Sequence, residues 1–198
     1  MERHAESLFK ACEVAMSSSH PLANGGVRVA TRTIEIPQRS LSRDQVRLAE
    51  WFLKQDPATV DLDEHTLKAT GHRYSFYGNS VVVERWFARD TIGMWDWHVR
   101  CGLRPPSDRI EVQAIAVGDL AFVGFPAEMF TEFGLRIKDE SPFRTTFVCG
   151  NANGYLGYIP TPEAFTHGGY ETRFATHSRL IPEAGDIMTE VALDLLGE

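Results

Sequence analysis

The sequence predicts an α/β protein in which helices pack on a mixed, largely antiparallel sheet of about four or five strands. Two stretches carry this prediction. Residues 109–117 alternate apolar and polar side chains, Gly118 and Asp119 supply a two-residue turn, and residues 120–125 return, which is the pattern of a β-hairpin. Residues 182–196 carry apolar side chains at helical spacing, so we expect a closing amphipathic helix on the sheet.

The N-terminal region predicts a helix followed by a strand. Within residues 3–16, small and apolar side chains recur at helical spacing with charges between them (Ala5, Leu8, Cys12 and Ala15). Residues 17–26 form a loop. Residues 26–38 alternate well and predict one long strand, with a bulge expected near Thr33, where the parity of the pattern changes.

Two further helices are expected before the hairpin. Ser42 and Gln45 match a capping box, and the helix that they open ends at Asp56 and Pro57. Residues 58–79 show no clean period and give no assignment. Residues 81–100 predict a long helix whose expected inward face consists of Val83, Phe87, Met94, Trp97 and Cys101.

The stretch after the hairpin predicts a functional site. Residues 120–125 form a continuous apolar run that is typical of a buried central strand, and a helical pattern begins after Pro126. This pattern places Glu128 in the first helical turn. A second apolar run, residues 145–149, leads into a loop that contains Tyr155 and Tyr158. Polar groups at the ends of two neighbouring strands are the usual way in which open α/β sheets build a site.

Composition narrows the class of protein. The chain has 198 residues, 43% of them hydrophobic, which predicts one compact domain over residues 1–198. A net charge of -7 without a basic cluster argues against nucleic acid as a partner. Three widely spaced cysteines predict reduced thiols. No apolar run approaches the length of a transmembrane segment and no signal peptide is recognisable, so the sequence predicts a cytoplasmic protein.

Two segments carry a family resemblance. GFPAEMFTEFGLRIK and the later NANGYLGYIPTPEAFTHGGYE resemble the neutral, non-lysosomal ceramidase family, and most closely its short bacterial members. The resemblance runs from about Gly26 to the C-terminus. It implies that the chain corresponds to the C-terminal half of a larger ceramidase-like catalytic domain. The family's activity is the zinc-dependent hydrolysis of the N-acyl amide bond of ceramide.

The resemblance also implies roles for individual residues. The family holds zinc with two histidines, a glutamate and a tyrosine; the glutamate falls on Glu128 and the tyrosine on Tyr158. A further active-site tyrosine, which helps to polarise the scissile carbonyl, falls on Tyr170. The family's histidine ligands lie in the first half of its domain and have no counterpart here. Among this chain's histidines, His167 is the one expected nearest the site, with His177 in a segment that departs from the family pattern.

Two interpretations follow. In the first, the chain is half of a zinc amidohydrolase for an N-acyl amide or lipid substrate; it binds zinc weakly and is inactive without a missing N-terminal half. In the second, it is a non-catalytic module that keeps the fold and acts by binding or self-association. A half-domain leaves a sheet edge and an apolar face uncovered, which predicts a tendency to form homo-oligomers.

Overall fold

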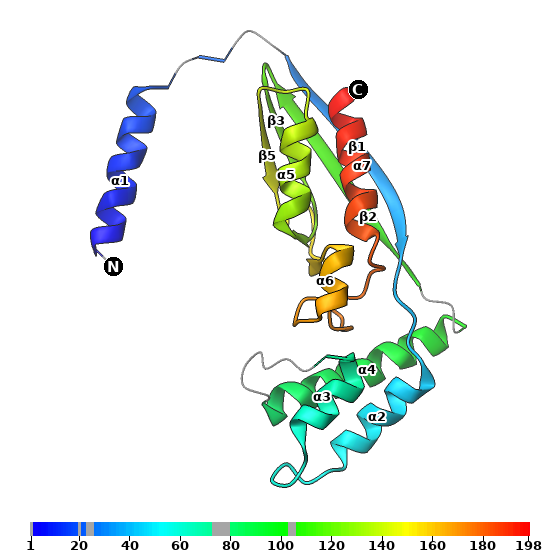
Figure 1. The fold of residues 1–198 in the computed structure, drawn as a ribbon. Helices are drawn as coiled ribbons and strands as arrows, with labels where there is room; N and C mark the ends of the chain where they lie inside the picture. The colour runs from blue at the N-terminus through cyan, green and yellow to red at the C-terminus, as the bar shows by residue number, and fades with distance from the viewer. Residues whose placement is uncertain (1, 20, 23–25, 73–79, 103–105) are drawn as a thin grey trace.

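The structure is a computed structural model that describes residues 2–19, 21–22, 26–72, 80–102 and 106–198. Four strands form the main sheet in the order β1-β2-β3-β5 (Figure 1). They are β1 (Val27–Pro37), β2 (Ser107–Val117), β3 (Leu120–Gly124) and β5 (Thr145–Cys149). The pairs β1·β2 and β2·β3 are antiparallel, whereas β3 and β5 run parallel. The prediction of a mixed, largely antiparallel sheet is confirmed.

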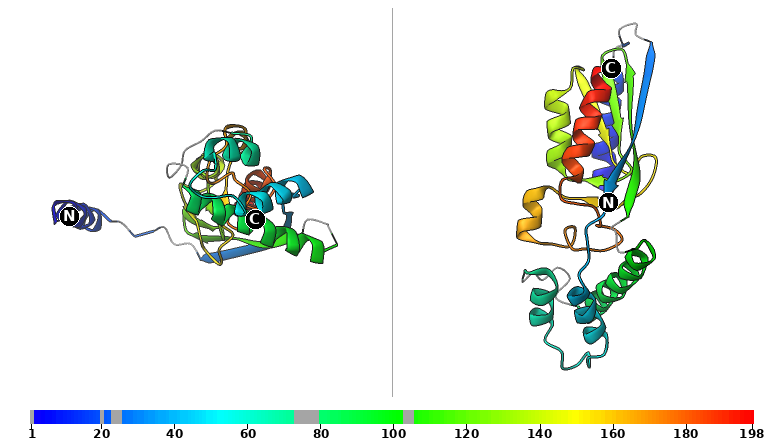
Figure 2. Two further views of the ribbon diagram at one scale, coloured as in Figure 1. Left: turned by 90° about the horizontal axis from the view of Figure 1, so that it is seen from below. Right: turned by 90° about the vertical axis from the view of Figure 1, so that its right-hand side faces the viewer.

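Two helices, α5 (Thr131–Glu140) and α7 (Ala184–Gly197), lie side by side on one face of this sheet (Figure 2). The main core lies between them and the strands. Ile110, Val112, Val123 and Phe125 from the sheet side pack with Phe133, Ile137, Met188 and Leu195 from the helices. The predicted closing helix is therefore α7. Its buried side chains cover part of this face of the sheet.

A second, smaller unit consists of three helices: α2 (Arg43–Leu53), α3 (Leu62–Thr70) and α4 (Val81–Arg100). The predicted capping box is present, because Ser42 Oγ accepts from the Gln45 amide at 3.2 Å and Gln45 Oε1 accepts from the Ser42 amide at 2.8 Å. α3 lies in the stretch that gave no assignment. In α4 the expected inward face is only partly right, since Trp97 and Cys101 are exposed.

Short elements connect the two units. β4 (Glu128–Met129) and β6 (Tyr158–Ile159) form a separate two-stranded sheet, and α6 (Pro162–His167) follows it. Two expectations are wrong here. Glu128 lies in a strand and not in the first turn of a helix, because its amide donates to the Gly157 carbonyl at 2.8 Å and α5 begins only at Thr131. The β1·β2 register is continuous, so there is no bulge near Thr33.

The N-terminal helix α1 (Glu2–Ser17) has the predicted bounds to within a residue but stands away from the rest of the chain (Figure 1). Its side chains from His4 to Ser17 are all exposed. Within the described part of the chain, none of the helices has the length and apolar character that crossing a bilayer requires.

Candidate functional site

Glu128 and Tyr158 are direct partners in the parallel pair of β4 and β6. Partners in a parallel register project their side chains to the same face of the sheet. Both residues accordingly line one cleft of about 430 Å³, together with Glu171 and Glu132. Two residues that lie 30 positions apart in sequence are thereby brought to one place by backbone pairing.

The backbone around this pair explains why it forms. Gly157 has φ +86°, and a Cβ built on it would lie 2.1 Å from the carbonyl oxygen of His177. Only glycine fits this close approach of two chain segments. The next amide, that of Tyr158, donates to the same His177 carbonyl at 2.7 Å. Gly157 therefore fixes Tyr158 between β4 and the segment that carries His177.

Tyr170 joins this pair. Its ring lies edge-on to the ring of Tyr158, with centroids 5.9 Å apart and planes at 78°. Two glycines of positive φ, Gly168 and Gly169, precede it and turn the chain back toward β6. The structure thus brings together all three residues that the sequence singled out, Glu128, Tyr158 and Tyr170.

His177 is the residue that sequence reasoning underrated. Its ring stacks on Tyr170, with centroids 4.7 Å apart and planes at 14°, and lies 5.8 Å from the ring of Tyr158. Its Nε2 is buried and has no hydrogen-bond partner among the described residues. His167, by contrast, is exposed, and its Nδ1 lies 3.1 Å from the carbonyl of Glu163 in its own helix. No spacing in the sequence distinguishes the two histidines.

The electrostatics of the cleft disfavour a phenolate in the absence of a cation. Burial raises the pKa of the Tyr158 phenol, and the nearby Glu128 carboxylate raises it further. Burial lowers the pKa of the His177 imidazole, an effect that the carboxylate of Asp90 partly opposes. The hydroxyl of Tyr155 donates to Glu128 Oε1 at 3.2 Å. Carboxylates and neutral phenols therefore face a cleft that would attract a positive ion.

These residues fit part of a zinc site. Protein zinc sites use three or four ligands drawn from histidine, cysteine and carboxylate side chains. Glu128 and Tyr158 offer two oxygen atoms to the same cleft. Among the described residues, no group of three or more histidine, cysteine, aspartate or glutamate side chains is placed to hold a metal ion. Glu128 and Tyr158 thus offer two of the three or four ligands that a zinc site requires.

A larger groove of about 600 Å³ runs along α4. The apolar side chains of its lining are Trp86, Met94 and Trp97, and they lie beside the charged Arg89, Asp90 and Arg179. The indole of Trp86 stacks on the ring of His177, with centroids 5.4 Å apart. Trp86 and His177 thus stand between the aromatic cluster of the cleft and the groove.

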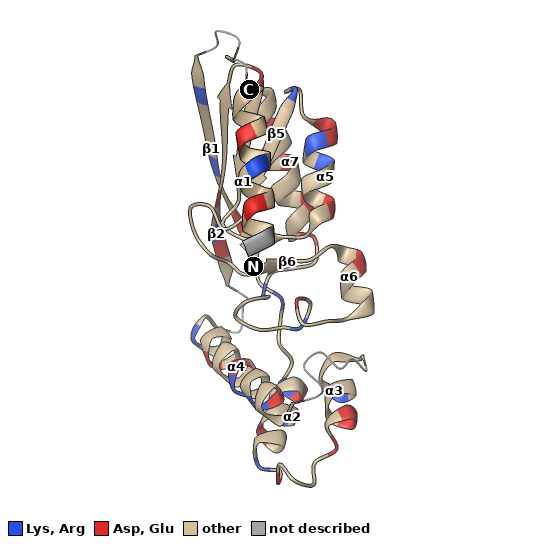
Figure 3. Ribbon diagram, turned by 90° about the vertical axis from the view of Figure 1, so that its left-hand side faces the viewer, with Lys and Arg blue, Asp and Glu red and all other residues tan. Residues whose placement is uncertain are grey.

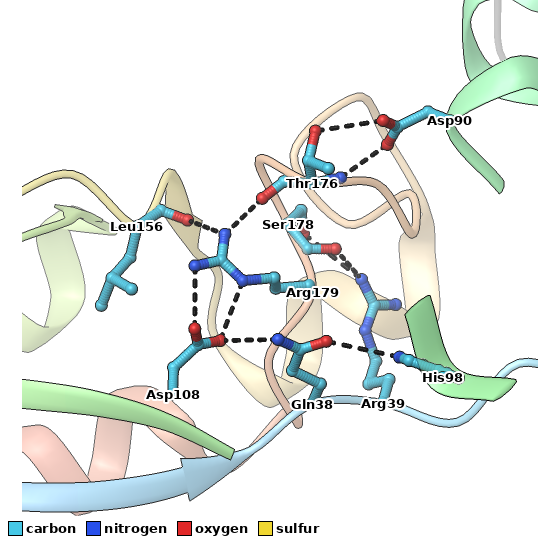
Figure 4. A network of polar contacts seen from close by, with 9 residues as sticks. All are labelled: Gln38, Arg39, Asp90, His98, Asp108, Leu156, Thr176, Ser178 and Arg179. Carbon is cyan, nitrogen blue, oxygen red and sulfur yellow. Dashed lines mark hydrogen bonds and ion pairs between the residues drawn. The ribbon is translucent and has the colours of Figure 1, made fainter. Parts of the chain in front are cut away.

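A polar network holds the segment that carries His177 (Figure 4). Arg179 donates to both carboxylate oxygens of Asp108, at 2.8 and 3.1 Å, and to the carbonyls of Leu156 and Thr176. On the other side of His177, Asp90 of α4 accepts from the amide of Thr176 at 2.6 Å. These bonds tie Thr176, the residue before His177, to α4 and Arg179, two residues after it, to β2, so the chain is held on both sides of His177.

Two solved structures that resemble this chain are ceramidases. One, described as a ceramidase complexed with C2, has a TM-score of 0.51 at 16% identity and matches 94% of this chain and 32% of its own. Another is the neutral ceramidase from Pseudomonas aeruginosa, with a TM-score of 0.50 at 19% identity over 94% of this chain and 30% of its own. No family model and no curated protein matches. The chain thus has the fold of about a third of these ceramidases, which confirms the resemblance at the level of fold.

Proposed function

We propose that the chain is the C-terminal half of a ceramidase-like zinc-dependent amidohydrolase that acts on an N-acyl amide. The observation that carries the proposal is the direct pairing of Glu128 with Tyr158 in one cleft of a ceramidase-like fold. In this proposal Glu128 and Tyr158 are metal ligands. Tyr170, whose ring contacts that of Tyr158, donates a hydrogen bond to the carbonyl oxygen that gains charge during hydrolysis.

A bound zinc ion supplies a Lewis acid and a water that ionises near neutral pH. The chain's own residues prepare for it. Glu128 provides a carboxylate oxygen in the cleft. Tyr158 keeps its proton until a cation is present, because its pKa is raised by burial and by Glu128. A phenolate ligand therefore forms together with metal binding, and the loss of its proton makes binding weaker at low pH.

The imidazole ligands are proposed to come from a separate N-terminal half. A site of two oxygen donors lacks the nitrogen ligands that give zinc sites most of their strength. The chain alone should consequently bind zinc weakly and hydrolyse no amide. The groove along α4 supports an apolar acyl chain as part of the substrate, because its tryptophan and methionine wall lies beside the aromatic cluster.

Zinc titration of the purified chain tests the half-site. We expect weak binding by calorimetry, which Glu128→Gln and Tyr158→Phe each abolish and which Glu132→Gln, a change in the same cleft, leaves intact. Stoichiometric tight binding would show that the site is complete without a second half. Turnover of an N-acyl amide by the isolated chain, lost in Glu128→Ala, would contradict the proposal more directly.

The second candidate function is a non-catalytic module that acts by binding or self-association. It is favoured by the lack of a three-residue metal cluster among the described residues and by the apolar surface that the chain exposes. It predicts no zinc binding at all and no effect of Glu128→Gln on any binding property. The same calorimetric titration therefore separates the two functions.

A further inference from the structure

The sheet face opposite α5 and α7 carries a continuous apolar row. Val29, Ile115, Phe122 and Phe147 are successive register partners across all four strands. Val29 is 57% exposed, Phe122 38% and Phe147 46%. The rings of Phe122 and Phe147 stack with centroids 5.0 Å apart. An exposed aromatic and aliphatic row of this length is the kind of surface that normally marks an interface.

The neighbouring row extends the patch, and the rest of the face limits it. Val27, Val117 and Leu120 are partners in the next row toward the β2–β3 turn. Away from the β2–β3 turn the same face becomes polar. There Thr31 pairs with Gln113, and Thr33 pairs with Glu111. We call these two apolar rows the open face. One half of one side of the sheet is thus hydrophobic and uncovered.

The helix α1 offers a complementary surface. At the helical rotation of about 100° per residue, its apolar side chains other than Val14 fall within an arc of about 160°. The arc consists of Ala5, Leu8, Phe9, Ala11, Cys12, Ala15 and Met16. Leu8 is 68% exposed and Phe9 63%. Glu6 and Lys10, which form an ion pair at 2.9 Å, lie on the other side, and Figure 3 shows the charges of both signs along α1.

A helix of 16 residues is marginal in water by itself and normally depends on packing of its apolar side. The chain therefore contains one amphipathic helix that needs a partner and one apolar sheet face that needs a cover. Residues 18–26 join the helix to β1, the edge strand of that same face. Even so, the structure holds α1 clear of its own sheet (Figure 1).

We propose that α1 of each copy packs on the open face of a second copy, so that two chains exchange their N-terminal helices in a two-fold symmetric dimer. Each copy supplies one helix and one face, and a reciprocal exchange leaves neither without a partner. The tether of nine residues can extend about 30 Å, which is enough to cross to a neighbouring molecule. The proposal does not depend on zinc or on amide hydrolysis.

Two cysteines allow the contact between α1 and the open face to be tested by cross-linking. Cys12 lies at the centre of the apolar arc of α1, and Cys149 lies on the open-face side of β5, two residues after Phe147. The third cysteine, Cys101, lies at the end of α4 and is removed in all test variants by Cys101→Ser. Exchange brings Cys12 of one copy close to Cys149 of the other, within reach of a short bis-maleimide cross-linker.

The decisive experiment mixes two chains, one carrying Cys12→Ser and the other Cys149→Ser, each with Cys101→Ser. We expect the linker to produce a covalent dimer in the mixture through the two remaining cysteines, with the linked peptides identified by mass spectrometry. Neither chain alone should give that Cys12–Cys149 link. A link that forms only within a single chain, in protein with both cysteines, would show that α1 folds onto its own sheet and would overturn the exchange.

Light scattering gives the independent measurement. The unmodified chain should have the mass of a dimer, and Leu8→Lys or Phe122→Lys should each raise the dimer dissociation constant by about 100-fold or more. Val14→Lys is the matched control, because Val14 is on the polar side of the same helix and equally exposed. A monomer at all concentrations, or a dimer that survives both Leu8→Lys and Phe122→Lys, would contradict the proposal.

Discussion

The carboxylate of Glu84 accepts two hydrogen bonds from the guanidinium of Arg173, at 2.6 and 2.7 Å, and both side chains are buried. The same guanidinium lies over the ring of Phe87, 3.8 Å from its centroid. Glu84 and Phe87 belong to α4, whereas Arg173 belongs to the segment that carries Tyr170 and His177. The three-helix unit is therefore part of what positions the aromatic side of the candidate site.

Replacing Arg173 with methionine should destabilise the protein by about 3–5 kcal/mol, because the buried Glu84 carboxylate would lose its guanidinium partner and keep only the His65 ring, whose Nε2 lies 3.5 Å away. Urea unfolding near neutral pH measures this loss. Arg47→Met is the control, since Arg47 forms an exposed ion pair with Asp44 at 3.3 Å and its loss should cost less than about 1 kcal/mol. The double variant Glu84→Leu/Arg173→Met should recover much of the lost stability, and a double variant no better than Arg173→Met would count against this explanation.

Stability should fall as the pH decreases below 6.5, and His65 is the main cause. Burial lowers the pKa of its imidazole from 6.5 to about 4 in the folded protein, with the Glu84 carboxylate opposing that effect. Between these two values the unfolded chain binds a proton that the folded chain does not bind, so acid favours unfolding. The loss is complete below the folded pKa and absent above 6.5.

Going from about pH 7.5 to about pH 5, this residue should cost about 2 kcal/mol of unfolding free energy. Urea midpoints at the two pH values measure the difference, and His65→Gln should reduce it. Burial also lowers the pKa values of His98 and His177. The His65→Gln variant should therefore still lose some unfolding free energy as the pH falls, but less than the unmodified protein. An unchanged slope in His65→Gln would assign the acid sensitivity to other groups.

The local parts of the fold could be predicted from sequence, because their signals lie within a few residues. Gly118 and Asp119 fix the hairpin turn, and the Ser42–Gln45 capping box fixes where α2 begins. Glu128 was misplaced because the helical period of Phe130, Phe133 and Ile137 could be extended backward without any local objection. The strand that contains Glu128 depends on Tyr158, and no local pattern reports a pairing between such distant residues.

In the candidate site, too, some residues could be predicted from sequence and others depend on long-range contacts. Glu128, Tyr158 and Tyr170 were found through a motif resemblance, and the structure places them together. His177 is held beside them by long-range contacts, namely the bond of its carbonyl with the Tyr158 amide and the bonds of Thr176 and Arg179 to α4 and β2. The signal available in the sequence was the departure from the family pattern around residues 172–176. This departure marks the segment that brings an imidazole to the tyrosines.

Tyr155→Phe should increase the affinity of the proposed half-site for zinc. The Tyr155 hydroxyl donates to Glu128 Oε1 at 3.2 Å and thus occupies an oxygen lone pair that a metal would use. Removing that donor should tighten zinc binding by a few-fold in calorimetry, roughly the net worth of one hydrogen bond. Because Tyr155 is largely exposed, its unfolding free energy should change by less than about 0.5 kcal/mol. Weaker zinc binding in the variant would mean that the Tyr155 hydroxyl contributes to zinc binding and does not compete with it.

Replacing glycine with alanine should have opposite effects at two positions. At Gly157, φ is +86° and the new Cβ would lie 2.1 Å from the His177 carbonyl oxygen, so alanine should destabilise by at least about 2 kcal/mol. At Gly93, inside α4, nothing lies within 4 Å of the new Cβ. There alanine should stabilise by about 0.5–1 kcal/mol, because it reduces the freedom of the unfolded chain and favours the helix. Urea unfolding of the two variants measures both changes in unfolding free energy. If Gly157→Ala has a mild or stabilising effect, β6 and His177 do not lie as close together as the hydrogen bond between the Tyr158 amide and the His177 carbonyl requires.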